Sequence, residues 1–182
     1  MTEPSLPDKV VAIHHRLDEA KVAHAFGGAL ALAYYAEPRA TIDIDVNVFV
    51  EPSRHVEVQT ELATLGVGDE VAPEAVERDG QCRIWWGATP VDLFYAYHDL
   101  HAAMRKAIRR VPFGSDTIPV LAPEHLVACK AVFNRPKDWL DIEQMLVGAP
   151  DLDRVEVGGW LDQILGADDP RTERFAELSG QL

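Results

Sequence analysis

The feature that most constrains this chain is an alternation of apolar and polar residues over residues 41–50. Ile42 and the aliphatic residues at every second position after it alternate with polar residues that include Asp43 and Asp45. A period of two is typical of a β-strand with one buried face. The pattern predicts a strand over 41–50 that points Ile42 into a core. It also predicts that Asp43 and Asp45 share the opposite face, with Cα atoms about 6–7 Å apart.

The composition is that of a globular protein. The chain has 182 residues, of which 47% are hydrophobic and 26% charged, so we expect one domain, or one domain with a small helical appendage. No apolar run reaches the ~18–20 residues that span a bilayer, and the N-terminal residues do not resemble a secretory signal. Two cysteines are too few for a disulfide scaffold, so we expect reduced thiols and a cytoplasmic location without membrane partners.

Apolar periodicity, glycine and proline divide the chain into short elements. Strands are expected at 24–26, 41–50, 83–86, 90–97, 111–113 and 117–121, and helices at 7–21, 29–36, 54–65, 98–110, 123–133, 136–147, 158–166 and 171–178. Residues 66–80 contain glycine, proline and acids and are expected to be a loop or weak structure. The order predicts an α+β fold, a small mixed β-sheet with flanking helices over residues 1–122. A C-terminal helical segment, residues 123–182, is expected to pack on it.

Adjacent carboxylates at Asp43 and Asp45 would repel each other, and a divalent cation would relieve that repulsion. A hard-oxygen site suits Mg²⁺, and two such ions can clamp the oxygens of a phosphoryl transfer. An acidic, solvent-facing edge strand is the alternative interpretation. Asp92 strengthens the metal hypothesis, because it interrupts an apolar strand between Val91 and Leu93, where an unpaired charge is costly.

A Gly27-Gly28 pair lies between a short strand and a predicted helix. Glycine lets the backbone approach a ligand closely, and a helix N-terminus offers N–H groups to a phosphate. A tight strand-to-helix turn without a ligand explains the same two residues equally well.

The formal net charge of −13 disfavours a nonspecific nucleic-acid coat protein, and we expect no DNA partner. Basic residues outnumber acids only in the middle of the chain, seven to five over residues 92–140. Arg105, Lys106, Arg109 and Arg110 would form one strip on the helix expected at 98–110. This strip is the predicted surface for a polyanionic acceptor.

Three motifs in order carry a resemblance to a known family. They are His24-Ala25-Phe26-Gly27-Gly28-Ala29-Leu30, then Arg39-Ala40-Thr41-Ile42-Asp43-Ile44-Asp45, then Val91-Asp92-Leu93. Together they resemble the DNA-polymerase-β-like nucleotidyltransferase superfamily. The Arg-x-Thr-x-Asp-x-Asp form is similar to its AbiEii/AbiGii-type branch, which includes toxins of toxin–antitoxin pairs. The segment from Lys130 to Asp141, with its Arg-Pro-Lys-Asp-Trp-Leu-Asp ending, is similar to a second signature of that branch.

The resemblance implies transfer of a nucleoside monophosphate from an NTP to a hydroxyl, with release of pyrophosphate. It implies that Asp43, Asp45 and Asp92 bind two Mg²⁺ ions, with Mn²⁺ as an alternative, and that Asp92 helps to deprotonate the acceptor. Gly27 and Gly28 would contact the triphosphate. The remaining implied site residues are Lys130 at the phosphates and Arg39, Thr41 and Asp138 near the nucleotide.

Simpler interpretations stay open for several of these residues. Lys130 could be a solvated lysine on an amphipathic helix. Asp138 and Asp141, at i and i+3, could form a local charge network with Arg135 and Lys137. Arg39 either touches substrate or positions the strand that carries the acids.

Three functions compete at this point. The branch implies a toxin that modifies a tRNA 3′ end and has an antitoxin protein as partner. A transferase acting on a small hydroxylated molecule, like the antibiotic-modifying members, needs no basic surface and agrees with the charge of −13. A catalytically inactive module that binds a nucleotide or a partner protein is the third, and retention of all three acids speaks against it.

Overall fold

A computed structural model describes residues 3–68 and 72–181 of the chain. It divides into two compact units: Met1–Leu30 with Ala40–Val120, and Ala31–Arg39 with Leu121–Leu182. The second unit therefore takes in a short segment far from it in sequence, besides the expected C-terminal helices. Among the described residues, every helix is too short or too polar to traverse a lipid bilayer.

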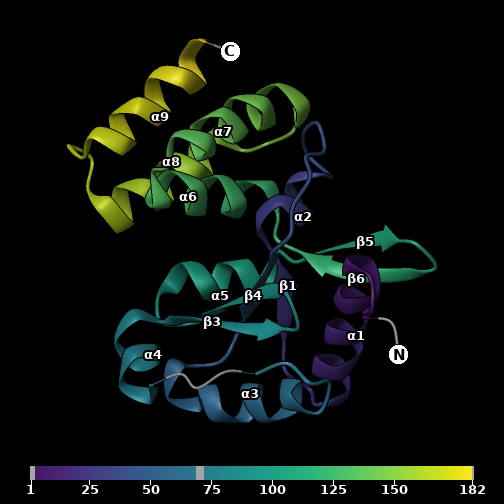
Figure 1. Cartoon of the computed structure of the whole chain (residues 1–182). Helices are drawn as coiled ribbons and strands as arrows, with labels where there is room; N and C mark the ends of the chain where they lie inside the picture. The colour runs from purple at the N-terminus through teal and green to yellow at the C-terminus, as the bar shows by residue number, and fades with distance from the viewer. Residues whose placement is uncertain (1–2, 69–71, 182) are drawn as a thin grey trace. The chain divides into compact units, whose positions relative to one another are not determined.

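The first unit is built on a six-stranded mixed sheet, in the order β3-β4-β2-β1-β6-β5 (Figure 1). The pairs β2–β4 and β1–β6 are parallel, and the other neighbours are antiparallel. The strands are β1 (His24–Phe26), β2 (Ile44–Val48), β3 (Gln81–Trp86), β4 (Thr89–Tyr95), β5 (Arg109–Phe113) and β6 (Asp116–Val120), and the helical elements are α1 (Leu6–Glu19), α2 (Gly28–Leu32), η1 (Pro52–Arg54), α3 (His55–Ala63), α4 (Pro73–Asp79) and α5 (Asp99–Lys106). The predicted α+β class with a mixed sheet is confirmed.

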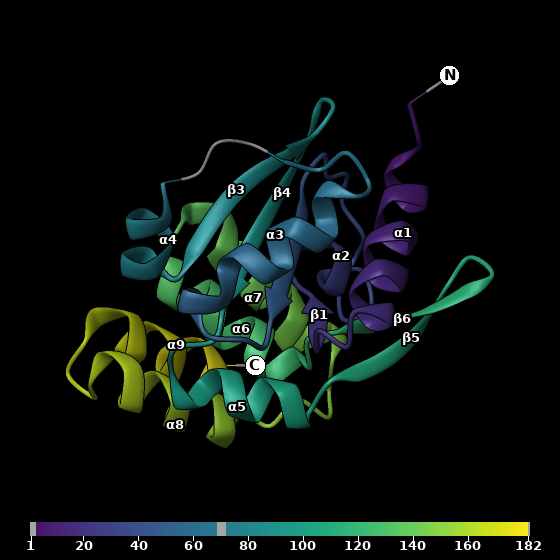
Figure 2. The same ribbon diagram turned by 90° about the horizontal axis from the view of Figure 1, so that it is seen from below.

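Helix α1 begins at a capping box formed by Ser5 and Asp8 and buries one face. Val10, Ile13 and Leu17 follow helical spacing and are almost completely inaccessible to solvent. Burying each such side chain stabilises the fold by about 1.5–3 kcal/mol. Helices α1 and α3 contact each other, and the β5–β6 hairpin forms one edge of the sheet (Figure 2).

The parallel pair β2–β4 sets the positions of two predicted site residues. Asp45 lies opposite Asp92, and the flanking residues Ile44 and Val91 form the preceding pair. Because side chains alternate along a strand, the two aspartates share one face and the buried aliphatic residues share the other.

Part of the strand prediction was wrong. Strand β2 begins at Ile44, so Asp43 lies in the preceding loop and is not on one strand with Asp45. Ile42 is 76% exposed and does not enter the core. The ladder to β4 begins at the pair Ile44–Val91, so among residues 3–68 and 72–181 no neighbouring strand holds residues 41–43 extended.

The predicted basic strip was also wrong. Helix α5 ends at Lys106, and Arg109 and Arg110 lie on β5, where they pair with Val120 and Pro119 of β6. Successive strand residues point to opposite faces, so the helical i, i+1, i+4, i+5 spacing does not exist. Pairing with β6 has overridden the helical pattern of residues 98–110.

Two further boundaries differ from the prediction. The segment 66–80, expected to be a loop or weak structure, contains α4, which begins at Pro73, ends at Asp79 and is capped by Gly80 in the left-handed conformation. Its residues 69–71 lie outside the described part of the chain. Helix α2 ends at Leu32, earlier than the expected residue 36.

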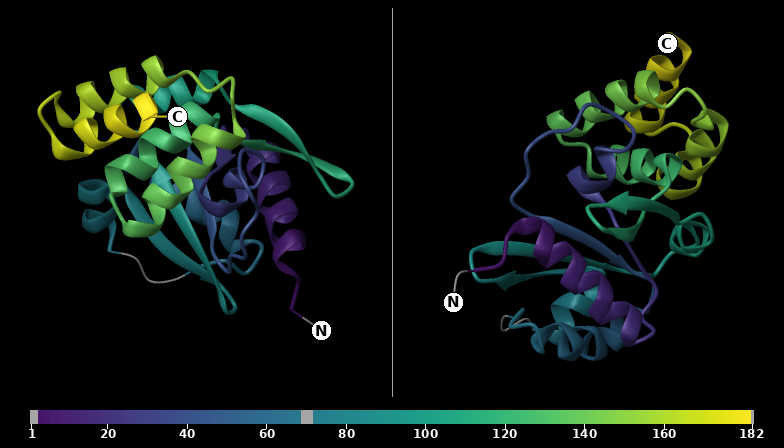
Figure 3. Two further views of the ribbon diagram at one scale, coloured as in Figure 1. Left: turned by 90° about the horizontal axis from the view of Figure 1, so that it is seen from above. Right: turned by 90° about the vertical axis from the view of Figure 1, so that its right-hand side faces the viewer.

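The second unit is helical. It contains α6 (Pro123–Phe133), α7 (Pro136–Gly148), α8 (Arg154–Leu165) and α9 (Pro170–Gln181). Helix α6 contacts each of the other three, and α8 and α9 lie side by side (Figure 3). Asn134, in the left-handed conformation, ends α6, and Pro136 opens α7.

A buried pair of histidines lies between α1 and β1. His14 Nδ1 and His24 Nε2 are 2.9 Å apart, and His24 Nδ1 lies 2.8 Å from the carbonyl oxygen of Val22. Because the carbonyl can only accept, His24 Nδ1 carries the proton and His14 Nδ1 donates to His24 Nε2. Burial lowers the pKa of His24 to about 4 and also lowers that of His14. Both rings are therefore neutral at pH 7.

This pair predicts a loss of stability in mild acid. The unfolded chain takes up a proton on His24 near pH 6.5, whereas the folded protein resists it until about pH 4. Between pH 7 and pH 5, the His24 contribution to the free energy of unfolding should fall by about 2 kcal/mol. Urea unfolding at both pH values checks this. His24→Gln should be less stable at pH 7 and less sensitive to pH, and an equal pH dependence in both proteins would contradict the assignment.

Candidate active site

Asp45 and Asp92 form the centre of the candidate site in the first unit. They are cross-strand neighbours on β2 and β4, and both side chains are half-buried. Like charges directly opposite each other in a sheet are destabilising, so this placement requires compensation from nearby groups.

The Gly27–Gly28 turn lies against Asp45. The Gly27 N–H donates to the backbone carbonyl of Asp45 at 3.0 Å, and Gly28 opens α2 with φ of +52°. A Cβ on Gly28 would lie 1.7 Å from Asp45 Oδ2. Glycine is therefore required here both by the left-handed backbone and by the close approach of the carboxylate.

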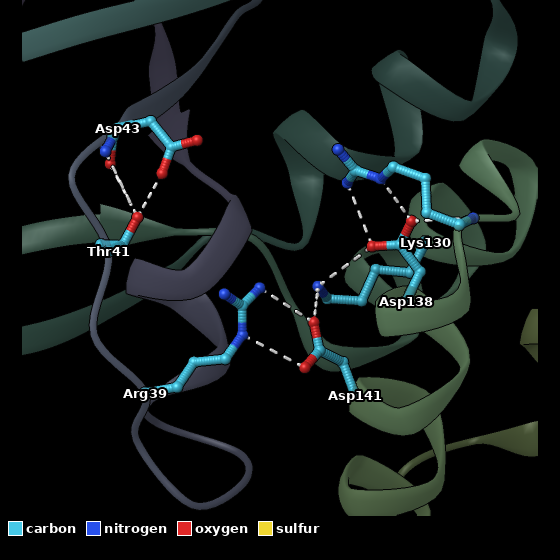
Figure 4. Close-up of polar contacts among 7 residues, drawn as sticks. Arg39, Thr41, Asp43, Lys130, Asp138 and Asp141 are labelled. Atoms are coloured by element: carbon cyan, nitrogen blue, oxygen red, sulfur yellow. Dashed lines mark hydrogen bonds and ion pairs between the residues drawn. The ribbon is translucent and has the colours of Figure 1, made fainter.

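Asp43 is held by its own loop. The Thr41 hydroxyl donates to Asp43 Oδ1, and Thr41 Oγ1 also lies 3.3 Å from the Asp43 backbone N–H (Figure 4). This local turn fixes the Asp43 carboxylate immediately before β2 begins. Thr41 thus positions an acid in this structure, a role that its place in the motif leaves open.

Arg83 is a member of the site that the sequence analysis did not identify. It lies on β3 opposite Asp92, and its Nε and Nη2 each donate to one carboxylate oxygen at 2.7 Å. The hydrogen bonds to Asp92 raise the pKa of Arg83, and the negative charges of Asp43 and Asp45 act in the same direction. The guanidinium thus brings a positive charge to the three acids.

The acids suit a hard divalent cation by their chemistry. Carboxylate oxygens are what Mg²⁺ prefers, and register places two of the three side by side. Within residues 3–68 and 72–181, however, no three His, Cys, Asp or Glu side chains are gathered into a set able to hold an ion. Asp92 points its oxygens to Arg83 instead. The chemistry of the donor set therefore fits a divalent cation, although the three carboxylates are not gathered into one set in the described part of the chain.

A second charged cluster lies in the helical unit. Lys130 on α6 donates to Asp141 Oδ2 at 2.6 Å and lies 3.8 Å from Asp138 Oδ1. Arg39 reaches Asp141 with Nε at 3.3 Å and Nη2 at 3.1 Å, and Arg135 binds Asp138 through two nitrogens (Figure 4).

Burial makes this cluster unusual. Lys130 is 4% exposed, Asp138 0% and Asp141 5%. Charges are buried in this way only when they are paired, and here each carboxylate serves two cations. The solvated-lysine interpretation of Lys130 is therefore wrong, because α6 is buried around it.

The predicted site residues are divided between the two units. Gly27, Gly28, Thr41, Asp43, Asp45 and Asp92 belong to the first, and Arg39, Lys130 and Asp138 to the second. Asp141, weighed in the sequence only as part of a local network, is the carboxylate shared by Lys130 and Arg39.

No family model matches the chain, and no curated protein matches it. Solved structures do share its fold. The antibiotic-resistance factor ANT(2'')-Ia in solution is 16% identical, with a TM-score of 0.63 over 99% of this chain and 98% of the other. Its crystal structure with adenylyl-2''-tobramycin is 15% identical, with a TM-score of 0.61 over 94% of this chain and 97% of the other. The lincosamide antibiotic adenylyltransferase LnuA, bound to lincomycin, is 12% identical, with a TM-score of 0.55 over 79% of this chain and 98% of the other.

These likenesses confirm the predicted nucleotidyltransferase fold. At such low identities they establish the fold alone. The AbiEii/AbiGii-type branch stays a prediction from the sequence motifs.

The contact between Gly28 and Asp45 makes a specific prediction. Gly28→Ala should destabilise the protein by more than the roughly 1–2 kcal/mol of an L-residue in the left-handed region, because Asp45 must also move. Gly114→Ala is the matched control, since Gly114 has φ of +62° and nothing within 4 Å of an added Cβ. Chemical denaturation measures both. Equal losses in the two variants would show that Asp45 does not press on Gly28.

The buried charges of the second unit predict non-additive stabilities. Asp141→Asn should cost about 3–5 kcal/mol, because it leaves Lys130 and Arg39 without their shared carboxylate. Lys130→Met combined with Asp141→Asn should cost less than the two single losses together. A double-mutant cycle by urea unfolding tests this, and simple additivity would contradict the coupling.

Proposed function

We propose that this protein is a nucleotidyltransferase that moves a nucleoside monophosphate from an NTP to a hydroxyl of a small molecule. In this reaction the acceptor oxygen forms a bond to the α-phosphorus, the bridging P–O bond breaks, and pyrophosphate leaves. The observation that carries the proposal is the pairing of Asp45 with Asp92, next to the Gly27–Gly28 turn, in a nucleotidyltransferase fold.

Asp43, Asp45 and Asp92 would hold one or two Mg²⁺ ions, with Mn²⁺ as an alternative. When bound, the metal supplies positive charge against the triphosphate and the leaving pyrophosphate. Asp92 is the acid that we assign to the acceptor hydroxyl, whose proton it would take. The absence of side chains at Gly27 and Gly28 gives the triphosphate access to the backbone.

The cluster of the second unit is assigned to the nucleotide. Lys130 is the residue that we expect to bind phosphate, and Asp138 and Asp141 hold its ammonium group in place. The Arg39 side chain retains an exposed fraction of 38% although it pairs with Asp141, and we assign it to contact with the nucleotide. Asp138, completely buried, acts through Lys130 and Arg135.

The acceptor is assigned to the class of small molecules on two grounds. The basic strip expected for RNA is not formed, since Arg109 and Arg110 lie on β5 apart from Arg105 and Lys106. The net charge of −13 also repels a polyanion at long range. ANT(2'')-Ia and LnuA, which share the fold, are described with tobramycin and lincomycin.

Transfer to a tRNA 3′ end, with an antitoxin as partner, is the second candidate. It is supported by the Arg39-x-Thr41-x-Asp43-x-Asp45 motif. The two candidates differ in their acceptor and share the chemistry of transfer, so one assay separates them.

The assay combines purified protein with Mg²⁺ or Mn²⁺, each labelled NTP and either total tRNA or a panel of hydroxylated small molecules that includes tobramycin and lincomycin. We expect label to appear on a small molecule. Label on tRNA alone would favour the second candidate, and no transfer to any acceptor would favour an inactive module.

Substitution of the acids tests the site itself. Asp45→Asn and Asp92→Asn should each lower transfer by at least about 10²–10³-fold while the protein stays folded, because charge stabilisation at the phosphates is lost. Asp79→Asn, which removes an exposed carboxylate that pairs with Arg78, is the matched control and should keep wild-type activity. Retention of most activity by Asp45→Asn would rule out this site.

A further inference from the structure

Three strands of the first unit align one basic and two acidic residues in a row. Arg83 on β3 is the cross-strand partner of Asp92 on β4, and Asp92 is the partner of Asp45 on β2. Cross-strand partners point to the same face, and neighbouring strands are about 4.8 Å apart. An arginine side chain is long enough to reach across this distance, and Arg83 does so toward Asp92.

The contact between Arg83 and Asp92 occupies both oxygens of that carboxylate. Nε donates to Oδ1 and Nη2 to Oδ2, each at 2.7 Å, which is the two-point geometry of a strong charge-assisted pair. Asp92 is 17% exposed, so its carboxylate is largely removed from water, whereas Arg83 is 51% exposed and can move into solvent. A cation that binds Asp92 must therefore take an oxygen that Arg83 now uses.

The same guanidinium also compensates the other acids. The negative charges of Asp43 and Asp45 also stabilise the positively charged form of Arg83. All three carboxylates therefore act on this one side chain. Without it, Asp45 and Asp92 would face each other as like charges across adjacent strands.

We propose that Arg83 is an internal counter-cation that competes with a divalent metal ion for Asp92. Arg83 holds the carboxylates together in the metal-free protein, and binding of the metal releases it from Asp92. The inference rests on the proposed function, because it takes Asp92 as a metal ligand. By reciprocity, the factor by which the Arg83–Asp92 pair weakens metal binding equals the factor by which the bound metal weakens the pair.

The test is isothermal titration calorimetry, in which Mn²⁺ alone is added to the metal-free chain. Arg83→Met should bind Mn²⁺ about tenfold more tightly than the wild type, since the competing charge-assisted bonds are gone. Arg83→Lys, which keeps the charge and loses the two-point geometry, should fall between them. Arg78→Met removes an equal charge from an exposed pair with Asp79 and should bind like the wild type.

A double-mutant cycle separates competition from a general effect of charge. In the Asp92→Asn background Arg83 has lost the carboxylate to which it donates two hydrogen bonds, so Arg83→Met should raise the affinity for Mn²⁺ much less than it does with Asp92 present. A gain of the same size in both backgrounds would overturn competition for Asp92.

A spectroscopic readout on the wild type avoids any loss of folding in the variants. The Nε–H resonance of Arg83, assigned by its absence in Arg83→Lys, should shift as diamagnetic Mg²⁺ is added, and it should stay fixed in Asp92→Asn. An unchanged resonance at saturating Mg²⁺ would overturn the proposal.

The outcomes distinguish this inference from the proposed function. If the wild type binds Mn²⁺, Asp45→Asn abolishes the binding and Arg83→Met binds no more tightly, the metal site stands and only the role of Arg83 is rejected. If neither the wild type nor Arg83→Met binds Mn²⁺ at millimolar concentration, the assignment of the acids to a metal fails, and the inference fails with it.

Discussion

The parallel pairing of β2 with β4 determines where negative charge collects in the first unit. Its register sets Asp45 opposite Asp92 and sets the aliphatic residues beside them, such as Ile44 and Val91, into the core on the other face. A shift of one residue would reverse both faces, so the hydrophobic core itself enforces the meeting of the two carboxylates. Two features accommodate the neighbouring carboxylates. Gly28, which has no side chain, leaves room for Asp45, and Arg83 neutralises the charge of Asp92.

Local patterns predicted the fold well where one face is buried. The alternation around Asp45 correctly indicated β2, and Pro123 and Pro136 correctly marked the starts of α6 and α7. The prediction was wrong where pairing between strands determines the secondary structure. Arg109, expected at the end of a helix over 98–110, lies on β5 because it pairs with β6. Nothing in residues 41–43 reveals that they lack a neighbouring strand, which is why Asp43 was assigned to β2.

The sequence predicted most residues of the site, but fewer of the contacts between them. Arg83 could have been found by counting: a hairpin with its turn at Gly87 pairs Trp86 with Thr89, and three further residues along each strand bring Arg83 opposite Asp92. The buried cluster of the second unit offered no such signal. The spacing of Asp138 and Asp141 describes a helix face, but their burial depends on Lys130 of another helix and on Arg39 from a distant segment.

The assignment of residues 31–39 to the helical unit has a consequence for synthesis of the chain. Within that unit, Tyr35 donates its hydroxyl to the carbonyl of Leu121 at 2.7 Å, and Gly148 leaves no room for a Cβ beside the Tyr35 carbonyl. During translation this segment leaves the ribosome long before α6 to α9 exist, and domains generally fold as units. The helical unit can therefore close only after α6 to α9 have been made, while the polypeptide passes between the units at 30–31, 39–40 and 120–121. A nascent chain stopped near residue 120 would leave Tyr35 without its hydrogen bond to Leu121 and without its neighbour Gly148.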